Sequence, residues 1–260
     1  MANFHSQEWF DSHIESHFNQ LQMLGYDVIA IFYYGSGNYG MDIESSDFDT
    51  IAFVAPKFSG MVALREPAST IVKCLDGEAK IRDIRYLPQI IKGQNYTDLQ
   101  IFYSIAYKIN VKYQNVFKGF FKWAEILSNW DTRRFLLAIS SQSYKALREC
   151  EPIGTHRYRW KKASIIARVY DYVTKLEKDC YITADLFTEE TEAWKLAYEC
   201  KITEVTFDSN TFEDFRQMQK EIEIKVKDLI EFEGLEFNSQ QLPAAFLEQI
   251  KEIVKIGMVE

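Results

Sequence analysis

The sequence predicts an α+β protein in which a lobe of helices and strands precedes a helical lobe. Two short runs rich in β-branched and aromatic residues, 28–34 and 47–54, indicate strands early in the chain. A similar run over 79–86 indicates a third strand. From residue 87 onward, nearly every segment has apolar residues at helical spacing, which is the pattern of a helical region.

The first predicted element is an amphipathic helix over 6–24, because apolar residues recur there at helical spacing. Gly25 ends it in a C-cap position. The run 28–34 is too compact for a helix and therefore predicts a buried strand. A loop punctuated by glycines covers 35–46 and leads into the second strand, which Pro56 stops.

Helices dominate the chain after the third strand. Their apolar spacing predicts them over 87–93, 99–105, 117–128, 133–150, 159–177, 189–200, 212–231 and 243–256. This change of pattern predicts two domains, an N-terminal α/β lobe over 1–115 and a helical lobe over 116–260.

The composition is typical of a globular protein, with 47% hydrophobic and 26% charged residues. We expect no secretory signal and no membrane partner, since no apolar run approaches the roughly 20 residues that cross a bilayer. Four widely spaced cysteines without a CxxC pair favour a reduced, cytoplasmic setting. The net charge of -8 disfavours long duplex DNA, because affinity for its backbone comes from lysine and arginine.

Asp47 and Asp49 are the first candidate site residues. Alternate residues of a strand project from the same face, so the spacing places both carboxylates together. Two like charges held this close are unfavourable unless a cation lies between them. Magnesium favours carboxylates combined with waters and phosphates, which predicts an Mg²⁺ site of two ions that Mn²⁺ could also fill.

Gly35 and Ser36 at the end of the preceding strand suit the phosphate side of such a site. Glycine lets the backbone approach a phosphate, and serine supplies a hydroxyl. A third carboxylate is needed for the acceptor, and we choose Asp83 on the third strand, although Asp76 and Glu78 lie close by. The alternative interpretation is turn chemistry at 46–47 followed by an ordinary exposed strand.

The two segments resemble the signature of the DNA polymerase β nucleotidyltransferase superfamily. Gly-Ser-Gly-Asn-Tyr-Gly at 35–40 and Ser-Ser-Asp-Phe-Asp at 45–49 are similar to its bacterial and phage "predicted nucleotidyltransferase" branch. The resemblance implies a nucleotidyltransferase-type mixed β-sheet with flanking helices, NTP (including ATP) and magnesium as ligands, and nucleotidyl transfer. It implies a nucleotide site at Gly35, Ser36, Tyr39 and Ser46, and catalytic metal ligands at Asp47, Asp49 and Asp83.

A basic and aromatic cluster over 156–162 is a second candidate site, and its Tyr-x-x-Lys-Lys pattern resembles a helix of the same branch. The functional interpretation is a triphosphate clamp, with Lys161 and Lys162 as cations and Tyr158 as a stacking ring. The alternative, equally weighted from the residues, is a solvated basic start of a helix. His13 and His17, four residues apart, are interpreted as a surface pair rather than a metal site.

Together these features predict a Mg²⁺-dependent nucleotidyltransferase that moves an NMP from an NTP to an acceptor hydroxyl or amine with release of pyrophosphate. The alternative is a catalytically inactive nucleotide- or protein-binding module of the same fold. The acceptor stays open. The acidic charge favours a small molecule or a protein, whereas the basic cluster favours an RNA 3′ end.

Overall fold

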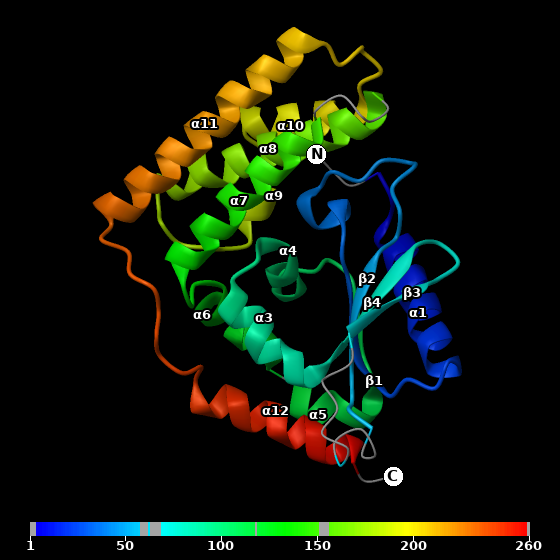
Figure 1. Ribbon diagram of the computed structural model, residues 1–260. Coiled ribbons are helices and arrows are strands. Elements are labelled where there is room, and N and C mark those ends of the chain that lie inside the picture. The colour runs from blue at the N-terminus through cyan, green and yellow to red at the C-terminus, as the bar shows by residue number, and fades with distance from the viewer. Residues whose placement is uncertain (1–3, 58–61, 63–68, 118, 151–155, 259–260) are drawn as a thin grey trace. The chain divides into compact units, whose positions relative to one another are not determined.

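The computed structural model describes residues 4–57, 62, 69–117, 119–150 and 156–258, and Figure 1 shows their path. The chain forms two compact units. The sheet unit contains Ala2–Lys92, Thr97–Leu127 and Ser239–Glu260. The helical unit contains Gly93–Tyr96 and Ser128–Asn238. The α+β class is therefore confirmed.

Strands, α-helices and short 3₁₀ turns make up the two units. The strands are β1 (Val28–Tyr33), β2 (Thr50–Val54), β3 (Ser69–Lys73), β4 (Glu78–Asp83) and β5 (Tyr107–Ile109). The α-helices are α1 (Gln7–Met23), α3 (Leu87–Gly93), α4 (Tyr96–Leu99), α5 (Gln114–Phe117), α6 (Ala124–Ser128), α7 (Thr132–Cys150), α8 (His156–Leu176), α9 (Asp185–Thr188), α10 (Glu192–Ile202), α11 (Ser209–Phe232) and α12 (Ala244–Gly257). The 3₁₀ turns are η1 (Ser36–Tyr39), η2 (Ile84–Tyr86), η3 (Gln100–Phe102), η4 (Val111–Tyr113) and η5 (Phe120–Trp123).

The five strands form one mixed sheet in the order β3-β4-β2-β1-β5. β2 and β4 run parallel, and the other neighbouring pairs run antiparallel. The two edge strands were not predicted. β3 is largely exposed, so it lacks the apolar signal of a buried strand, and β5 has only three residues.

The core of the sheet unit lies between α1 and one face of the sheet. α1 buries the apolar stripe that its sequence spacing predicted, and Ile31, Tyr33, Ala52 and Ile81 face it from the strands. Phe32 points to the opposite face. Its ring lies 6.3 Å from that of Phe117 in α5. Both faces of the central strands are therefore covered, which explains why β1 and β2 are buried along their whole length.

The last helix, α12, belongs to the sheet unit although it follows the helical unit in sequence. Gln249 accepts a hydrogen bond from Trp123 Nε1 at 3.1 Å and donates one to the Val116 carbonyl at 2.5 Å. The domain boundary at 115/116 stays a prediction. The two compact units divide the chain differently, because Thr97–Leu127 and Ser239–Glu260 both belong to the sheet unit. Composition cannot show where a terminal helix buries its apolar face.

The helical unit contains α7, α8, α10 and α11, and none of the described helices combines the length and apolar character needed to cross a bilayer. A buried ion pair stabilises its centre. Lys175 Nζ lies 2.8 Å from Asp171 Oδ2, one turn away on α8. The same ammonium donates to the carbonyls of Leu186 and Glu189, at 3.2 and 2.7 Å, and the Thr191 hydroxyl donates to Asp171. The pair thereby ties the segment around α9 to α8.

Asp171→Ala is expected to lower the free energy of unfolding by about 3–5 kcal/mol, because it leaves the buried Lys175 ammonium without its counter-charge. Urea unfolding followed by circular dichroism measures this loss. Asp228→Ala, on an exposed position of α11, is the matched control and should change stability by less than about 0.5 kcal/mol. Equal losses in the two variants would contradict a stabilising role for the pair.

The interpretation of His17 as a surface residue is wrong, because its side chain is fully buried under α1. Its Nδ1 atom lies 3.1 Å from the Thr50 hydroxyl oxygen. Burial lowers the pKa of His17 to about 4, with Asp76 partly opposing the shift. Helical spacing alone could not separate the two histidines, since the edge of the buried stripe passes between them.

A neutral His17 makes stability depend on pH. Its pKa in the unfolded chain is near 6.5, so its contribution is complete above that pH and is lost as the pH falls toward 4. We expect this group to lower the free energy of unfolding by about 2–3 kcal/mol when the pH falls from 7 to 4. Urea unfolding at both pH values should show a smaller loss for His17→Gln than for the wild type. An identical loss would show that His17 does not titrate as described.

Candidate functional site

Three carboxylates meet where β2 and β4 begin. The parallel register pairs Thr50 with Ala79, so the preceding residues, Asp49 and Glu78, also lie side by side. The Glu78 N–H donates to Asp49 Oδ1 at 3.0 Å. Asp47 and Asp49 both lie in the segment that leads into β2, which begins at Thr50, rather than in the strand itself as predicted.

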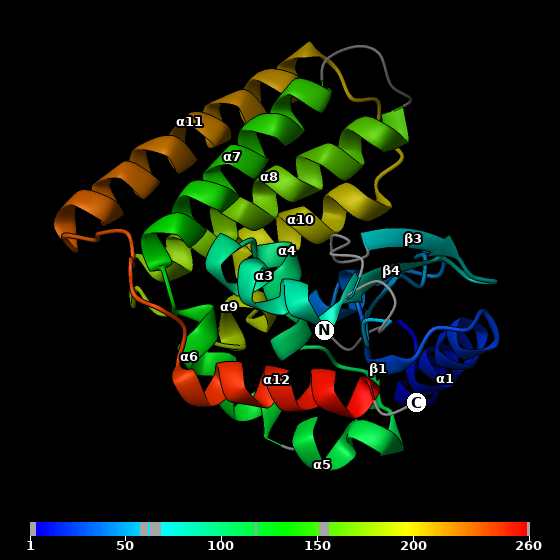
Figure 2. The ribbon, with the colours of Figure 1, turned by 60° about the horizontal axis from the view of Figure 1, so that its bottom comes forward.

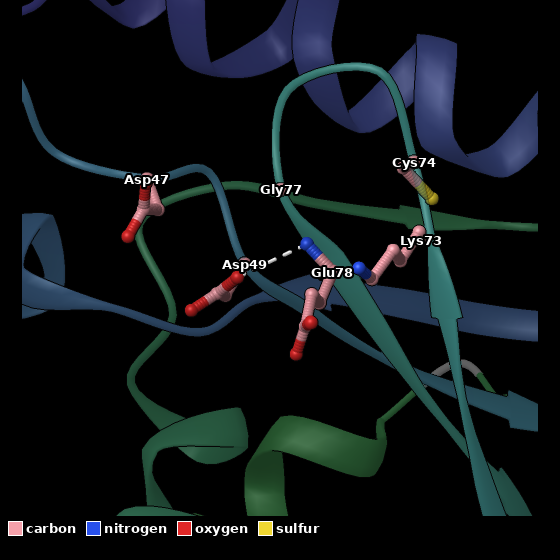
Figure 3. Close-up of a pocket in the computed structure, with 6 residues that line it drawn as sticks. All are labelled: Asp47, Asp49, Lys73, Cys74, Gly77 and Glu78. Carbon is pink, nitrogen blue, oxygen red and sulfur yellow. Dashed lines mark hydrogen bonds between the residues drawn. The ribbon is translucent and has the colours of Figure 1, made fainter.

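These carboxylates line a pocket of about 320 Å³, which is formed by Asp47, Asp49, Lys73, Cys74, Gly77 and Glu78. Figure 3 shows the carboxyl groups of Asp47, Asp49 and Glu78 on the same side of the backbone. All the residues of this pocket belong to the sheet unit.

Phe48 holds the two aspartates in this orientation. Its side chain is buried, with ring centroids 5.0 Å from Tyr33 and 5.3 Å from Trp9. Its N–H donates to the Asp76 carbonyl at 3.1 Å, which ties the segment to the turn between β3 and β4. Because Phe48 points into the core, its two neighbours point away from it.

The pocket is unfavourable for three negative charges. Burial is the main cause that raises the pKa of Asp49, and the charges of Asp47 and Glu78 raise it further. The Glu78 N–H and the charge of Lys80 act in the opposite direction. A cation that binds in the pocket would therefore stabilise the ionised form of Asp49.

The structure does not bring Asp83 to this pocket. Glu78 lies where Asp83 was expected, beside Asp47 and Asp49. Asp83 pairs with Val54 at the other end of the parallel strands, roughly 16 Å along β4 from Glu78 at about 3.3 Å per residue. Its carboxylate forms an ion pair with Arg85 at 2.8 Å and caps η2. Glu78 and Asp83 are close in sequence, but only the parallel register shows which end of β4 lies beside Asp49.

The Gly35–Ser36 segment lies directly after β1. A side chain at Gly35 would come within 2.7 Å of the Tyr33 hydroxyl, so glycine is required while that buried ring stays in place. Ser36 Oγ lies 3.4 Å from Ser46 Oγ, and Ser46 immediately precedes Asp47. The two hydroxyls thus lie together at the residue that precedes Asp47, although neither serine lines the pocket. Tyr39 is buried, so its ring packs in the core.

The basic cluster of the helical unit has partners within that unit. Figure 2 shows α7 and α8 side by side, and Glu149 on α7 faces the start of α8. Lys162 forms an ion pair with Glu149, and the Tyr158 hydroxyl lies 3.4 Å from the same carboxylate. Lys161 is exposed. These contacts favour a structural role for Tyr158 and Lys162, and a clamp that includes Lys161 stays a prediction.

Comparison of the sequence with protein-family models finds no match, and comparison with curated proteins finds no significant match.

Gly77→Ala is expected to disturb the pocket, because the added Cβ would lie 2.3 Å from the backbone oxygen of Phe48. The overlap should cost about 1–3 kcal/mol of unfolding free energy, which chemical denaturation measures. Gly93→Ala is the matched control, since nothing lies within 4 Å of its Cβ position at the end of α3. That variant should be neutral or gain up to about 1 kcal/mol. A Gly77→Ala protein as stable as Gly93→Ala would contradict the close packing of the turn.

Proposed function

We propose that this protein is a Mg²⁺-dependent nucleotidyltransferase that moves an NMP from an NTP to an acceptor hydroxyl or amine. The observation that carries the proposal is the convergence of Asp47, Asp49 and Glu78 on one pocket. The Ser36 and Ser46 hydroxyls supply the phosphate side of the site. The resemblance of the 35–49 segment to nucleotidyltransferases supports the same assignment.

The donor set fits a hard divalent cation. Carboxylate oxygens are the protein ligands that Mg²⁺ and Mn²⁺ accept, and magnesium needs only one or two of them beside waters and phosphates. Within the described part of the chain, no group of three or more His, Cys, Asp or Glu side chains is placed so that it could hold a metal ion by itself. An arrangement that substrate phosphates complete is consistent with both facts. Asp47 and Asp49 would hold the two ions, and Glu78 would share one of them.

The bound ions would supply charge neutralisation at the triphosphate and would lower the pKa of the attacking hydroxyl. The residues of the chain orient the reactants. Ser36 and Ser46 donate to phosphate oxygens, and Glu78 accepts the proton of the acceptor. The new bond joins the acceptor oxygen or nitrogen to the α-phosphorus, the bond between the α-phosphorus and its bridging oxygen breaks, and pyrophosphate leaves.

The acceptor is a small molecule or a protein in our proposal, because the net charge of -8 disfavours a polyanionic partner. The pairing of Lys162 with Glu149 weakens the main argument for an RNA 3′ end. Incubation with α-labelled NTPs and fractionated cell extract separates these acceptors, since the label enters the small-molecule, protein or nucleic-acid fraction.

Asp47→Asn is expected to abolish label transfer from α-labelled NTP, because it removes a metal ligand while keeping the shape of the side chain. Glu78→Gln should lower transfer by about 100-fold or more. Asp83→Asn, at the other end of the same strand, is the matched control and should retain transfer. Circular dichroism and thermal melting check that each variant is folded.

Two results would overturn this assignment. Undiminished transfer by folded Asp47→Asn would contradict the role of Asp47 as a metal ligand. Loss of transfer in Asp83→Asn but not in Glu78→Gln would show that Asp83, and not Glu78, is the third carboxylate. Metal-independent nucleotide binding by the wild type, with no release of pyrophosphate, would favour the inactive binding module.

A further inference from the structure

A row of charged side chains lies on the sheet face opposite α1. Along β4, Ala79 and Ile81 are buried in the core under α1, so the alternate residues Glu78, Lys80 and Arg82 project from the other face. Glu78 is the carboxylate of the candidate site. Lys80, two residues further on, is therefore the next side chain of β4 on the same face.

Lys80 reaches across β2 toward β1. Its Nζ lies 3.9 Å from the ring centroid of Tyr34, the residue directly after β1. β2 lies between β4 and β1 in the sheet, so the ammonium of Lys80 and the ring of Tyr34 meet over β2. Tyr34 donates its N–H to the Asp49 carbonyl at 2.8 Å. The ammonium is therefore held against Tyr34, the residue before Gly35, and its charge acts on Asp49.

Two carboxylates, Asp49 and Asp98, lie near enough to attract the ammonium of Lys80. It acts on Asp49 and on Asp98 of α4, and it lowers the pKa of both carboxyl groups against the dominant effect of burial. Arg82 also acts on Asp98, and its Nη1 atom donates to the Ser69 hydroxyl. Lys80 is half-buried between these groups.

We propose that Lys80 binds the β- and γ-phosphates of the NTP, a role that rests on the proposed function. Three carboxylates and a triphosphate together carry more negative charge than two divalent ions neutralise. A lysine ammonium is a suitable point charge for phosphate oxygens. Lys80 lies on the strand that carries Glu78, and its ammonium contacts Tyr34, which directly precedes Gly35 and Ser36.

Two other lysines are the competitors for this role, and each is tested by its own variant. Lys73 lines the pocket and lies opposite Glu78 in the β3–β4 register, but it is on the exposed edge strand β3. Lys161 is the exposed cation of the predicted clamp in the helical unit. Glutamine at each position removes the charge and keeps most of the side-chain length.

Isothermal titration calorimetry of the full chain with inorganic tripolyphosphate and Mg²⁺ tests the proposal without requiring turnover. Lys80→Gln is expected to weaken tripolyphosphate binding by about 10-fold or more, the effect of one charge-assisted hydrogen bond. Lys80→Arg should retain most of the affinity, and Lys73→Gln and Lys161→Gln, which test the competing lysines, should each weaken binding less than Lys80→Gln. Thermal melting checks that each variant is folded.

Wild-type affinity in folded Lys80→Gln would overturn the inference, as would a larger loss in Lys73→Gln or Lys161→Gln. Absence of tripolyphosphate binding by the wild type would overturn it as well. None of these outcomes decides nucleotidyl transfer, which the Asp47→Asn assay measures separately. If the wild type binds tripolyphosphate through Lys80 but shows no nucleotidyl transfer, the polyphosphate site stands and the proposed enzyme activity does not.

Discussion

The parallel pairing of β2 with β4 is the constraint on which the candidate site depends. It brings the beginnings of two strands to the same edge of the sheet, so residues 29 positions apart in sequence become neighbours. The Glu78 N–H bonded to Asp49 Oδ1 fixes this edge directly. A shift of one residue in the register would turn Glu78 to the core face and place Ala79 beside Asp49.

Apolar packing holds the charged groups in position. Phe48 is buried among the rings of α1 and β1, and it separates two aspartates that would otherwise be free to turn. Gly77 allows the turn after β3 to approach the Phe48 backbone closely enough for the Phe48 N–H to donate to the Asp76 carbonyl. The core thus stabilises an arrangement of like charges that electrostatics alone would oppose.

The charges of this sheet face have a consistent order. The carboxylates lie at the edge where β2 and β4 begin, and the ammonium of Lys80, further along β4, contacts Tyr34 directly after β1. Negative charge that raises the pKa of Asp49 favours a divalent cation, and the neighbouring ammonium favours an anion. A metal–polyphosphate complex combines both requirements, which is why the phosphate ligand is sought in the sheet unit itself.

The sequence by itself determined the local elements and part of the site. Apolar spacing predicted α1, β1 and the long helices, and the Asp-x-Asp spacing with the preceding Gly-Ser segment predicted Asp47, Asp49 and Ser36 as a group, because those relations lie within a few residues. Only the tertiary structure decided that Glu78 rather than Asp83 lies beside them, that β3 and β5 complete the sheet, and that His17 is buried. These features depend on register and on packing between distant segments, which local periodicity does not record.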